Sequence, residues 1–125
     1  MTEKRYEVGL QLMDKIVGEP GNHTRESLND IAPDFERFLV EFPFGDIYSR
    51  PGVDMKSREI ATISALTALG YAIPQLKVHI NGALNVGCTK EEIIEIIMQM
   101  SVYAGFPAAL NGLNAAKEVF ASRNL

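Results

Sequence analysis

Helical periodicity is the feature that most constrains this chain of 125 residues. Apolar side chains recur at intervals of three and four along every long patterned segment, and no segment alternates with a period of two for long enough to predict a strand. Proline and glycine stand between these segments, where helices usually begin and end. The sequence therefore predicts an all-α fold, and the length is that of a single domain spanning residues 1–125.

The first half of the chain mixes helical patterns with turn formers. Residues 3–17 carry apolar side chains at four-residue spacing, as an amphipathic helix does. The run 19–23 (EPGNH) predicts a turn, with a short helix starting at Thr24, and Pro33 predicts the start of the next helix. The inner face of this helix would carry Phe35, Phe38, Leu39 and Phe42. Its solvent face would carry Glu36, Arg37 and Glu41. Residues 43–53 contain two prolines and two glycines and predict a connector.

Four further helices are predicted in the second half. The first follows Asp54, a plausible N-cap, and runs to about Leu69; its C-terminal part is almost wholly apolar, so we expect a central helix buried nearly all round. The second spans residues 74–86. The sequence of residues 89–92 (TKEE) fits a capping box and starts the third helix, and Pro107 starts the last one.

Charge and cysteine content exclude several classes of function. The net charge is −4 with both signs mixed along the chain, which argues against nucleic acid and against anionic membranes as partners. The N-terminus has no signal-peptide core, and no apolar run reaches the length of a membrane span, so a cytoplasmic protein is expected. The lone cysteine, Cys88, excludes an internal disulfide, and no set of His, Asp and Glu shows metal-ligand spacing.

Two ionisable residues fall on helix faces that should be buried. Glu59 shares a stripe with apolar residues of the predicted central helix, and His79 lies in line with apolar residues of the next helix. A desolvated carboxylate holds its proton more tightly, and a nearby imidazole could share it, so the two would suit acid and base catalysis. The alternative is a structural role, because a lone histidine on an apolar face is more often a satisfied core residue.

Four other residues are candidates with a structural alternative each. Arg58 points roughly 100° around the helix from Glu59 and could bind an acidic substrate or form an ion pair with another helix or subunit. Gln75, one turn before the histidine, and Tyr103 could contact a ligand, although tyrosine at a helix end usually packs. Cys88 is expected to be a packing residue, since free cysteine behaves as a small hydrophobe.

Three strings carry a resemblance to a known family. SREIATISALTALG, LKVHINGALNVGCTKEEIIEII and VYAGFPAALNGLNAAKEVF look like consecutive blocks of the carboxymuconolactone decarboxylase family, and FPFGDIYSRPGVD is similar to the lead-in of its small single-domain members. The family core would cover about residues 33–121, with the three strings between residues 54 and 121. The resemblance implies an alkylhydroperoxidase D-like domain around a central helical hairpin. It also implies homo-oligomers, as hexamers built from trimers of dimers or as trimers.

The same resemblance bears on the chemistry. In the alkylhydroperoxidase-like branch a glutamate precedes a Cys-x-x-Cys-x-x-x-His motif, and Glu59 and His79 match its glutamate and histidine. The two cysteine positions hold Ala72 and Gln75, so the thiol chemistry is missing while the acid/base partners remain.

The function that the resemblance implies is a carboxy-lyase. Such an enzyme would act on a small carboxylated lactone or related acid, a small anionic substrate, by proton transfer and decarboxylation without a metal or organic cofactor. His79 would transfer the proton, Glu59 would orient it, and Arg58, Gln75 and Tyr103 would contact the substrate. The alternatives are an oxidoreductase of the alkylhydroperoxidase or peroxiredoxin type, and a non-enzymatic oligomer that binds a small ligand.

Overall fold

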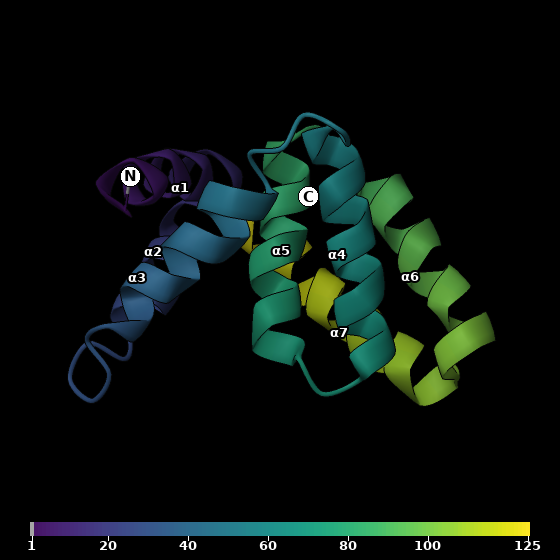
Figure 1. The fold of residues 1–125 in the computed structure, drawn as a ribbon. Coiled ribbons are helices and arrows are strands. Elements are labelled where there is room, and N and C mark those ends of the chain that lie inside the picture. Colours follow the sequence, from purple (N-terminus) through teal and green to yellow (C-terminus); the bar gives the residue numbers. More distant parts are fainter. Residues whose placement is uncertain (1) are drawn as a thin grey trace. The chain divides into compact units, whose positions relative to one another are not determined.

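The computed structural model describes residues 2–125, which form helices and turns without a strand in that range (Figure 1). In chain order the helices are α1 (Thr2–Ile16), α2 (Gly18–Glu26), α3 (Phe35–Leu39), η1 (Val40–Ile47), α4 (Met55–Leu69), α5 (Ile73–Asn85), α6 (Lys90–Ala104) and α7 (Phe106–Ser122). The all-α prediction is confirmed. The chain divides into two compact units, one up to Asp54 and the other from Met55 to Leu125, and each is described by itself.

The first unit is held together by close backbone contact between α1 and the π-helix η1. A Cβ on Gly9 would lie 2.3 Å from the carbonyl oxygen of Val40, and a Cβ on Gly45 would lie 2.5 Å from the carbonyl oxygen of Arg5. Only glycine fits at two such positions. Beside this contact Arg5 donates to Asp46 at 2.7 Å, a hydrogen bond that raises the pKa of the arginine and lowers that of the aspartate.

The predicted turn at residues 19–23 is wrong, because these residues lie inside α2. The backbone turns earlier, at Gly18, whose φ is +57°. Pro20 then falls in the first turn of the helix, where its missing N–H costs nothing. Thr24 does not start a helix either; it lies in α2 and its hydroxyl donates to the carbonyl of Pro20 at 2.9 Å.

The helix expected from Pro33 differs in two ways. Regular helix begins at Phe35, and from Val40 it continues as η1, so the connector expected from residue 43 is shorter than predicted. Pro43 lies inside η1. Because proline has no N–H, it cannot donate the backbone hydrogen bond of a regular α-helix, and the chain forms the wider π turn here instead. The wider turn rotates the following side chains, so Phe44 is buried. Among the predicted inner-face residues, those exposed are Phe35, Phe38 and Phe42.

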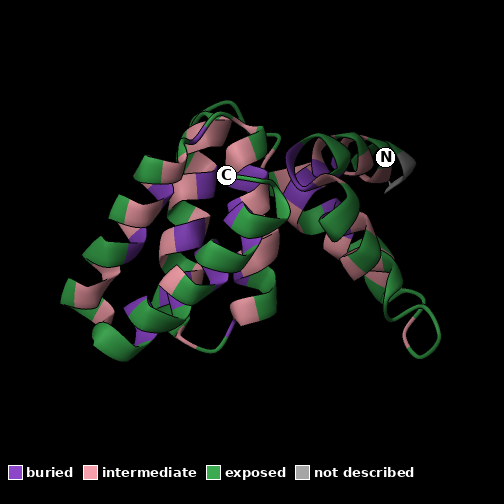
Figure 2. Cartoon of the chain, turned by 180° about the vertical axis from the view of Figure 1, so that it is seen from behind, coloured by how far each residue is buried: buried purple, intermediate pink, exposed green. Residues whose placement is uncertain are grey.

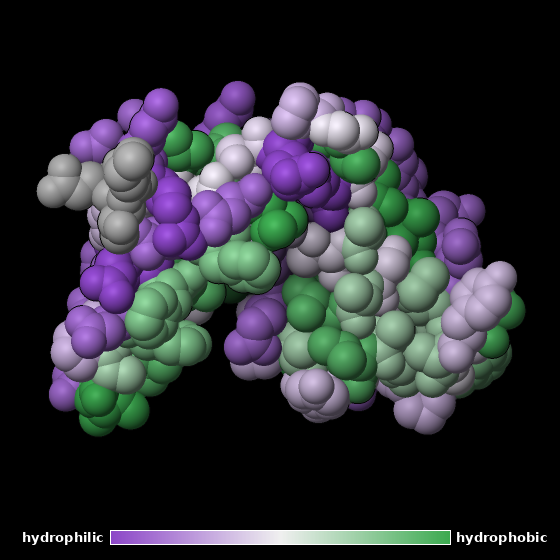
Figure 3. All heavy atoms as spheres, viewed as in Figure 1, coloured by the Kyte–Doolittle hydropathy of each residue, from purple (hydrophilic) through white to green (hydrophobic). Residues whose placement is uncertain are grey.

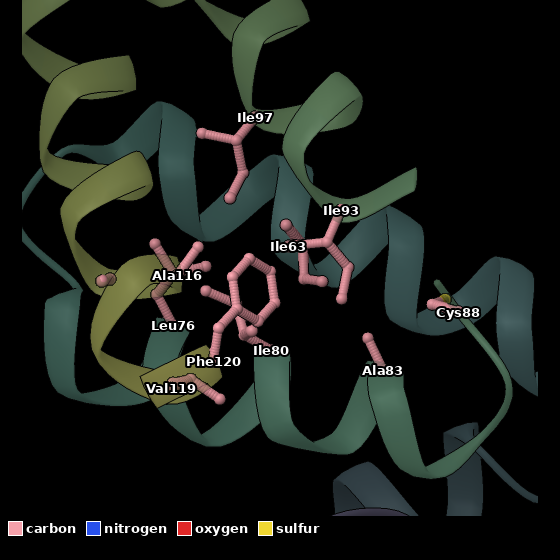
Figure 4. Packing of buried hydrophobic residues seen from close by; sticks show 11 residues of the cluster. Ile63, Leu76, Ile80, Ala83, Cys88, Ile93, Ile97, Ala116, Val119 and Phe120 are labelled. Carbon is pink, nitrogen blue, oxygen red and sulfur yellow. The ribbon is translucent and has the colours of Figure 1, made fainter. Parts of the chain in front are cut away.

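The second unit packs α4, α5, α6 and α7 around one apolar core (Figures 2 and 4). Its buried members come from all four helices and the α5–α6 turn: Ile63, Leu76, Ile80, Ala83, Cys88, Ile93, Ile97, Ala115, Ala116, Val119 and Phe120. On α4 the buried residues are Glu59, Ile63 and Thr67, at four-residue spacing, because the other helices pack along one stripe. The expectation of all-round burial for α4 is therefore wrong for a single chain.

The helix boundaries of this unit agree closely with the predictions. Gly70 and Gly87 follow α4 and α5 with φ of +81° and +103°, values that favour glycine. The capping box is present: Glu92 N–H donates to Thr89 Oγ1 at 3.0 Å, and Thr89 N–H donates to Glu92 Oε1 at 2.8 Å. These contacts fix the start of α6.

Candidate active site

Glu59 is the most deeply buried charged residue described in the second unit. It lies in the second turn of α4 on the stripe that faces the core, and its side chain has 0% of its surface exposed. The expected burial of this carboxylate is confirmed. A carboxylate in such a position requires a hydrogen-bond partner, because leaving it unpaired costs far more than leaving a surface group unpaired.

His79 is that partner. It lies in the middle of α5, and its Nδ1 is 2.9 Å from Oε2 and 3.3 Å from Oε1 of Glu59. The side chain of His79 keeps 19% of its surface exposed, so the imidazole connects a buried carboxylate with the outside of the unit. When Glu59 is ionised, Nδ1–H donates to it and Nε2 becomes the nitrogen that can exchange a proton. The structure thus brings together the two residues that the sequence analysis selected.

Two of the residues predicted to contact the substrate lie close to Glu59 and His79 on the same two helices. Gln75 is exposed on the first turn of α5, four residues before His79 and therefore on the same face. Arg58 is half-buried on α4 beside Glu59. Their predicted contacts with a substrate stay predictions.

Tyr103 lies at the other end of the unit. Glu92, at the start of α6, pairs with Lys56 on the first turn of α4 at 3.0 Å, and Tyr103 is about 16 Å further along α6 by helix rise. Its side chain is 80% exposed. Within one chain the structure does not bring Tyr103 to Glu59 and His79, so its predicted substrate contact would need a second copy.

Cys88 belongs to the core, as its predicted packing role requires. The residue is buried, and its thiol lies 3.9 Å from the carbonyl oxygen of Lys56. Burial raises the pKa of the thiol, and the nearby charge of Glu92 raises it further. A buried thiol with a raised pKa is a poor nucleophile.

A second buried carboxylate, Glu41, was assigned to the solvent face by the sequence analysis. In η1 it is only 4% exposed, Arg37 Nε is 3.6 Å from its Oε1, and its Oε2 has no hydrogen-bond partner. The π turn before Pro43 rotates the side chain of Glu41 inward. In the sequence, Pro43 was the feature that could have indicated this irregular turn.

No group of three or more His, Cys, Asp and Glu among residues 2–125 is arranged to hold a metal ion. In the same range no helix is both long and apolar enough to cross a membrane.

Comparison of the sequence with known proteins identifies its family. Residues 33–118 match the carboxymuconolactone decarboxylase family. The chain is 40% identical over 119 residues to a 4-carboxymuconolactone decarboxylase of Acinetobacter baylyi, covering 94% of this chain and 88% of that protein. It is 37% identical over 99 residues to an uncharacterised 15.0 kDa protein of Paracoccus denitrificans, covering 78% and 74%.

A third relative has a different named substrate. The chain is 27% identical over 112 residues to a nitrosuccinic acid decarboxylase of Metarhizium robertsii, covering 86% of this chain and 76% of that protein. The family match spans more than half of the chain, and the Acinetobacter relative is covered almost end to end. The chain therefore belongs to the carboxymuconolactone decarboxylase family.

Proposed function

We propose that this protein is a decarboxylase of small carboxylated lactones or related acids, and that it uses proton transfer without a metal or organic cofactor. The observation that carries the proposal is the 2.9 Å contact between His79 Nδ1 and the fully buried carboxylate of Glu59. The names of the two decarboxylase relatives support the reaction class.

The chemistry of the two named substrates supports the absence of a cofactor. Decarboxylation leaves an electron pair on carbon, and that pair needs a group to accept it. A lactone carbonyl conjugated with that carbon can accept the pair in carboxymuconolactone, and a nitro group can accept it in nitrosuccinic acid. Since each substrate brings its own electron acceptor, the protein has to supply only a proton and donors for carboxylates.

The proposed reaction balances with a single proton. The bond between the ring carbon and the carboxylate breaks, carbon dioxide leaves, and the electron pair moves into the lactone carbonyl. Protonated His79 then gives its Nε2 proton to carbon and becomes neutral, and water returns a proton to it before the next turnover. Glu59 stays ionised, accepts the hydrogen bond from Nδ1–H and stabilises the imidazolium ion.

Binding of the substrate is assigned to three side chains. Arg58 would pair with a carboxylate, Gln75 would donate its amide beside His79, and Tyr103 would contribute only from a second copy. The whole assembly would be a homo-oligomer, a hexamer or a trimer, built on the helical hairpin of α4 and α5.

The peroxide-reducing alternative has less support. Its two cysteine positions hold Ala72 and Gln75, and the lone Cys88 is buried with a raised pKa. A dithiol cycle requires two accessible thiols.

The experiment is a substrate panel measured with the purified protein. Carbon dioxide release is followed for 4-carboxymuconolactone, nitrosuccinate and succinate, of which only succinate lacks an electron acceptor. We expect turnover of at least one of the first two compounds and none of succinate, and one deuterium from D₂O in the product carbon. Consumption of cumene hydroperoxide with dithiothreitol, together with no carbon dioxide from any compound, would contradict the proposal and favour the oxidoreductase.

A further inference from the structure

A pocket on the first unit lies between α1 and the segment formed by the turn before α3, α3 itself and η1. Its volume is about 500 Å³, which is within the usual range of small-molecule sites. Its charged lining consists of four carboxylates and one guanidinium, from Glu7, Asp34, Glu36, Glu41 and Arg37. On the face seen in Figure 3, hydrophilic residues of the first unit form a band beside apolar ones. The charge of this lining favours a cationic ligand.

Glu41 is the buried member of this lining. It is only 4% exposed, and its Oε2 has no hydrogen-bond partner. Arg37 Nε lies 3.6 Å from the other oxygen, Oε1, which is too far for a hydrogen bond. A buried carboxylate oxygen without a donor costs free energy, and a ligand that donates to it removes that cost. The terminal torsion of a glutamate is soft, so the carboxylate can turn Oε2 toward a donor in the pocket.

The other three carboxylates differ in how far they are engaged. Glu36 is already satisfied, because the hydroxyl of Tyr6 donates to its Oε1 and Arg25 donates to the same oxygen at 3.1 Å. Glu7 and Asp34 are exposed, and we name them the rim carboxylates. The side chain of Asp34 makes no capping hydrogen bond to α3. The pocket therefore offers one buried carboxylate and two exposed ones to a ligand.

The arrangement of these carboxylates favours an organic cation over a metal ion. Within residues 2–125 no cluster of three or more His, Cys, Asp and Glu side chains could hold a metal. A ligand therefore has to reach the buried carboxylate and the rim carboxylates with separate charges. Pro33 and the ring of Tyr6 line the same pocket and offer apolar contact to a hydrocarbon chain. The face of an aromatic ring also attracts an alkylammonium group.

We infer that this pocket binds a short aliphatic diamine, with one ammonium group at Glu41 and the other at the rim carboxylates. An ammonium group is a compact cation with three N–H donors, and Glu41 Oε2 lacks a donor. A monoamine would engage only one end of the pocket, and an anion would be repelled by four carboxylates. The inference is independent of the proposed decarboxylation.

The test is isothermal titration calorimetry of the whole protein with 1,4-diaminobutane, and with butylamine and magnesium chloride for comparison, all at one ionic strength. Glu41→Gln removes the buried charge and keeps the shape of the side chain. A double variant, Glu7→Gln with Asp34→Asn, removes the rim carboxylates. The matched control, Asp14→Asn with Asp30→Asn, removes two exposed carboxylates of the same unit that do not line the pocket. Far-UV circular dichroism gives the helix content of each variant.

We expect saturable binding of one diamine per chain and weaker binding of butylamine. Glu41→Gln should weaken diamine binding roughly tenfold or more, because it removes a charged acceptor. The rim variant should weaken it several-fold, and the control variant should leave it unchanged.

The inference is overturned if the diamine does not bind saturably, or if Glu41→Gln with normal helix content binds it as tightly as the unchanged protein. Should Glu41→Gln lose helix content, the rim variant decides, and undiminished binding by it would overturn the inference. Equal losses in the rim and control variants, or displacement of the diamine by magnesium at the same ionic strength, would show attraction by net charge alone and would overturn it too.

Discussion

Two substitutions of His79 separate a catalytic role from a structural one. Asparagine carries its amide nitrogen two bonds from Cβ, as histidine carries Nδ1, so His79→Asn can keep the donor that lies 2.9 Å from Glu59. Glutamine carries its amide one bond further out, near the place of Nε2, so His79→Gln withdraws the donor from the carboxylate. Both variants lose the imidazole that the proposed proton transfer needs.

The expected magnitudes follow from the burial of Glu59. Its carboxylate has no exposed surface, so losing its partner in His79→Gln should cost about 2 kcal/mol, which is within the usual 1–3 kcal/mol for an unsatisfied buried group. For a domain of this size that corresponds to a melting temperature lower by roughly 8 °C. His79→Asn keeps the hydrogen bond and should stay within about 1 kcal/mol of the unchanged protein.

The two variants should differ in stability but not in activity. We expect both variants to lose roughly 10²–10⁴-fold in turnover per folded molecule, because each lacks the general acid. Adding Glu59→Gln to His79→Asn should lower turnover little further, since residues that act as a unit are not additive. His23→Asn, at the exposed second histidine, is the control and should change neither quantity.

The assay combines thermal melting with carbon dioxide release from whichever panel compound is turned over. A His79→Asn variant with full turnover would remove His79 from the proton transfer. Full turnover per folded molecule in both variants, with a lower melting temperature for His79→Gln, would show that the pair only stabilises the fold.

Three further predictions concern packing and charge. Gly9→Ala would place a Cβ 2.3 Å from a backbone carbonyl of η1 and should destabilise the chain by about 1–3 kcal/mol or more in urea unfolding, whereas Gly52→Ala meets no atom within 4 Å and should change little. Thr67→Val removes a buried hydroxyl that has no hydrogen-bond partner and should raise the free energy of unfolding by about 1 kcal/mol; a clear loss would refute that reasoning. The amide of Thr89 lowers the pKa of Glu92, so the carboxylate's contribution is present above its unfolded pKa and lost as pH falls through the folded value. Glu92→Gln should therefore lower the melting temperature at pH 7, and the difference should begin to shrink as the pH falls below about 4.

The second unit was predictable because local signals and packing agree there. Glycines after α4 and α5, the capping box before α6 and apolar stripes of helical period all indicate the same boundaries. The pairing of Glu59 with His79 was predictable for a similar reason, since each is the polar member of an apolar stripe. Two buried stripes on helices joined by a short turn have to face one another.

The first unit could not be predicted to the same depth. The turn formers Glu19 to Asn22 also suit the first turn of a helix, and only the positive φ of Gly18 decides between these readings. The π-helix shifts the register by one residue, which reverses the positions of Phe42 and Glu41. A pattern with a period of 3.6 residues assumes a regular α-helix, so it cannot reveal a π turn that inserts one residue.

The composition of α4 serves both the candidate site and the core. Its inward stripe begins at Glu59, which supplies the carboxylate, and continues through Ile63 and Thr67, whereas Leu69 at the end of the helix is exposed. A helix that packs against its own chain along one stripe needs apolar residues only there. Ile60 and Leu66 lie beside that stripe and also pack, partly buried, against the core, whereas Ala61 and Ala65 are exposed. All-round burial of α4 was therefore wrong, because small apolar residues such as alanine favour a helix without having to be buried.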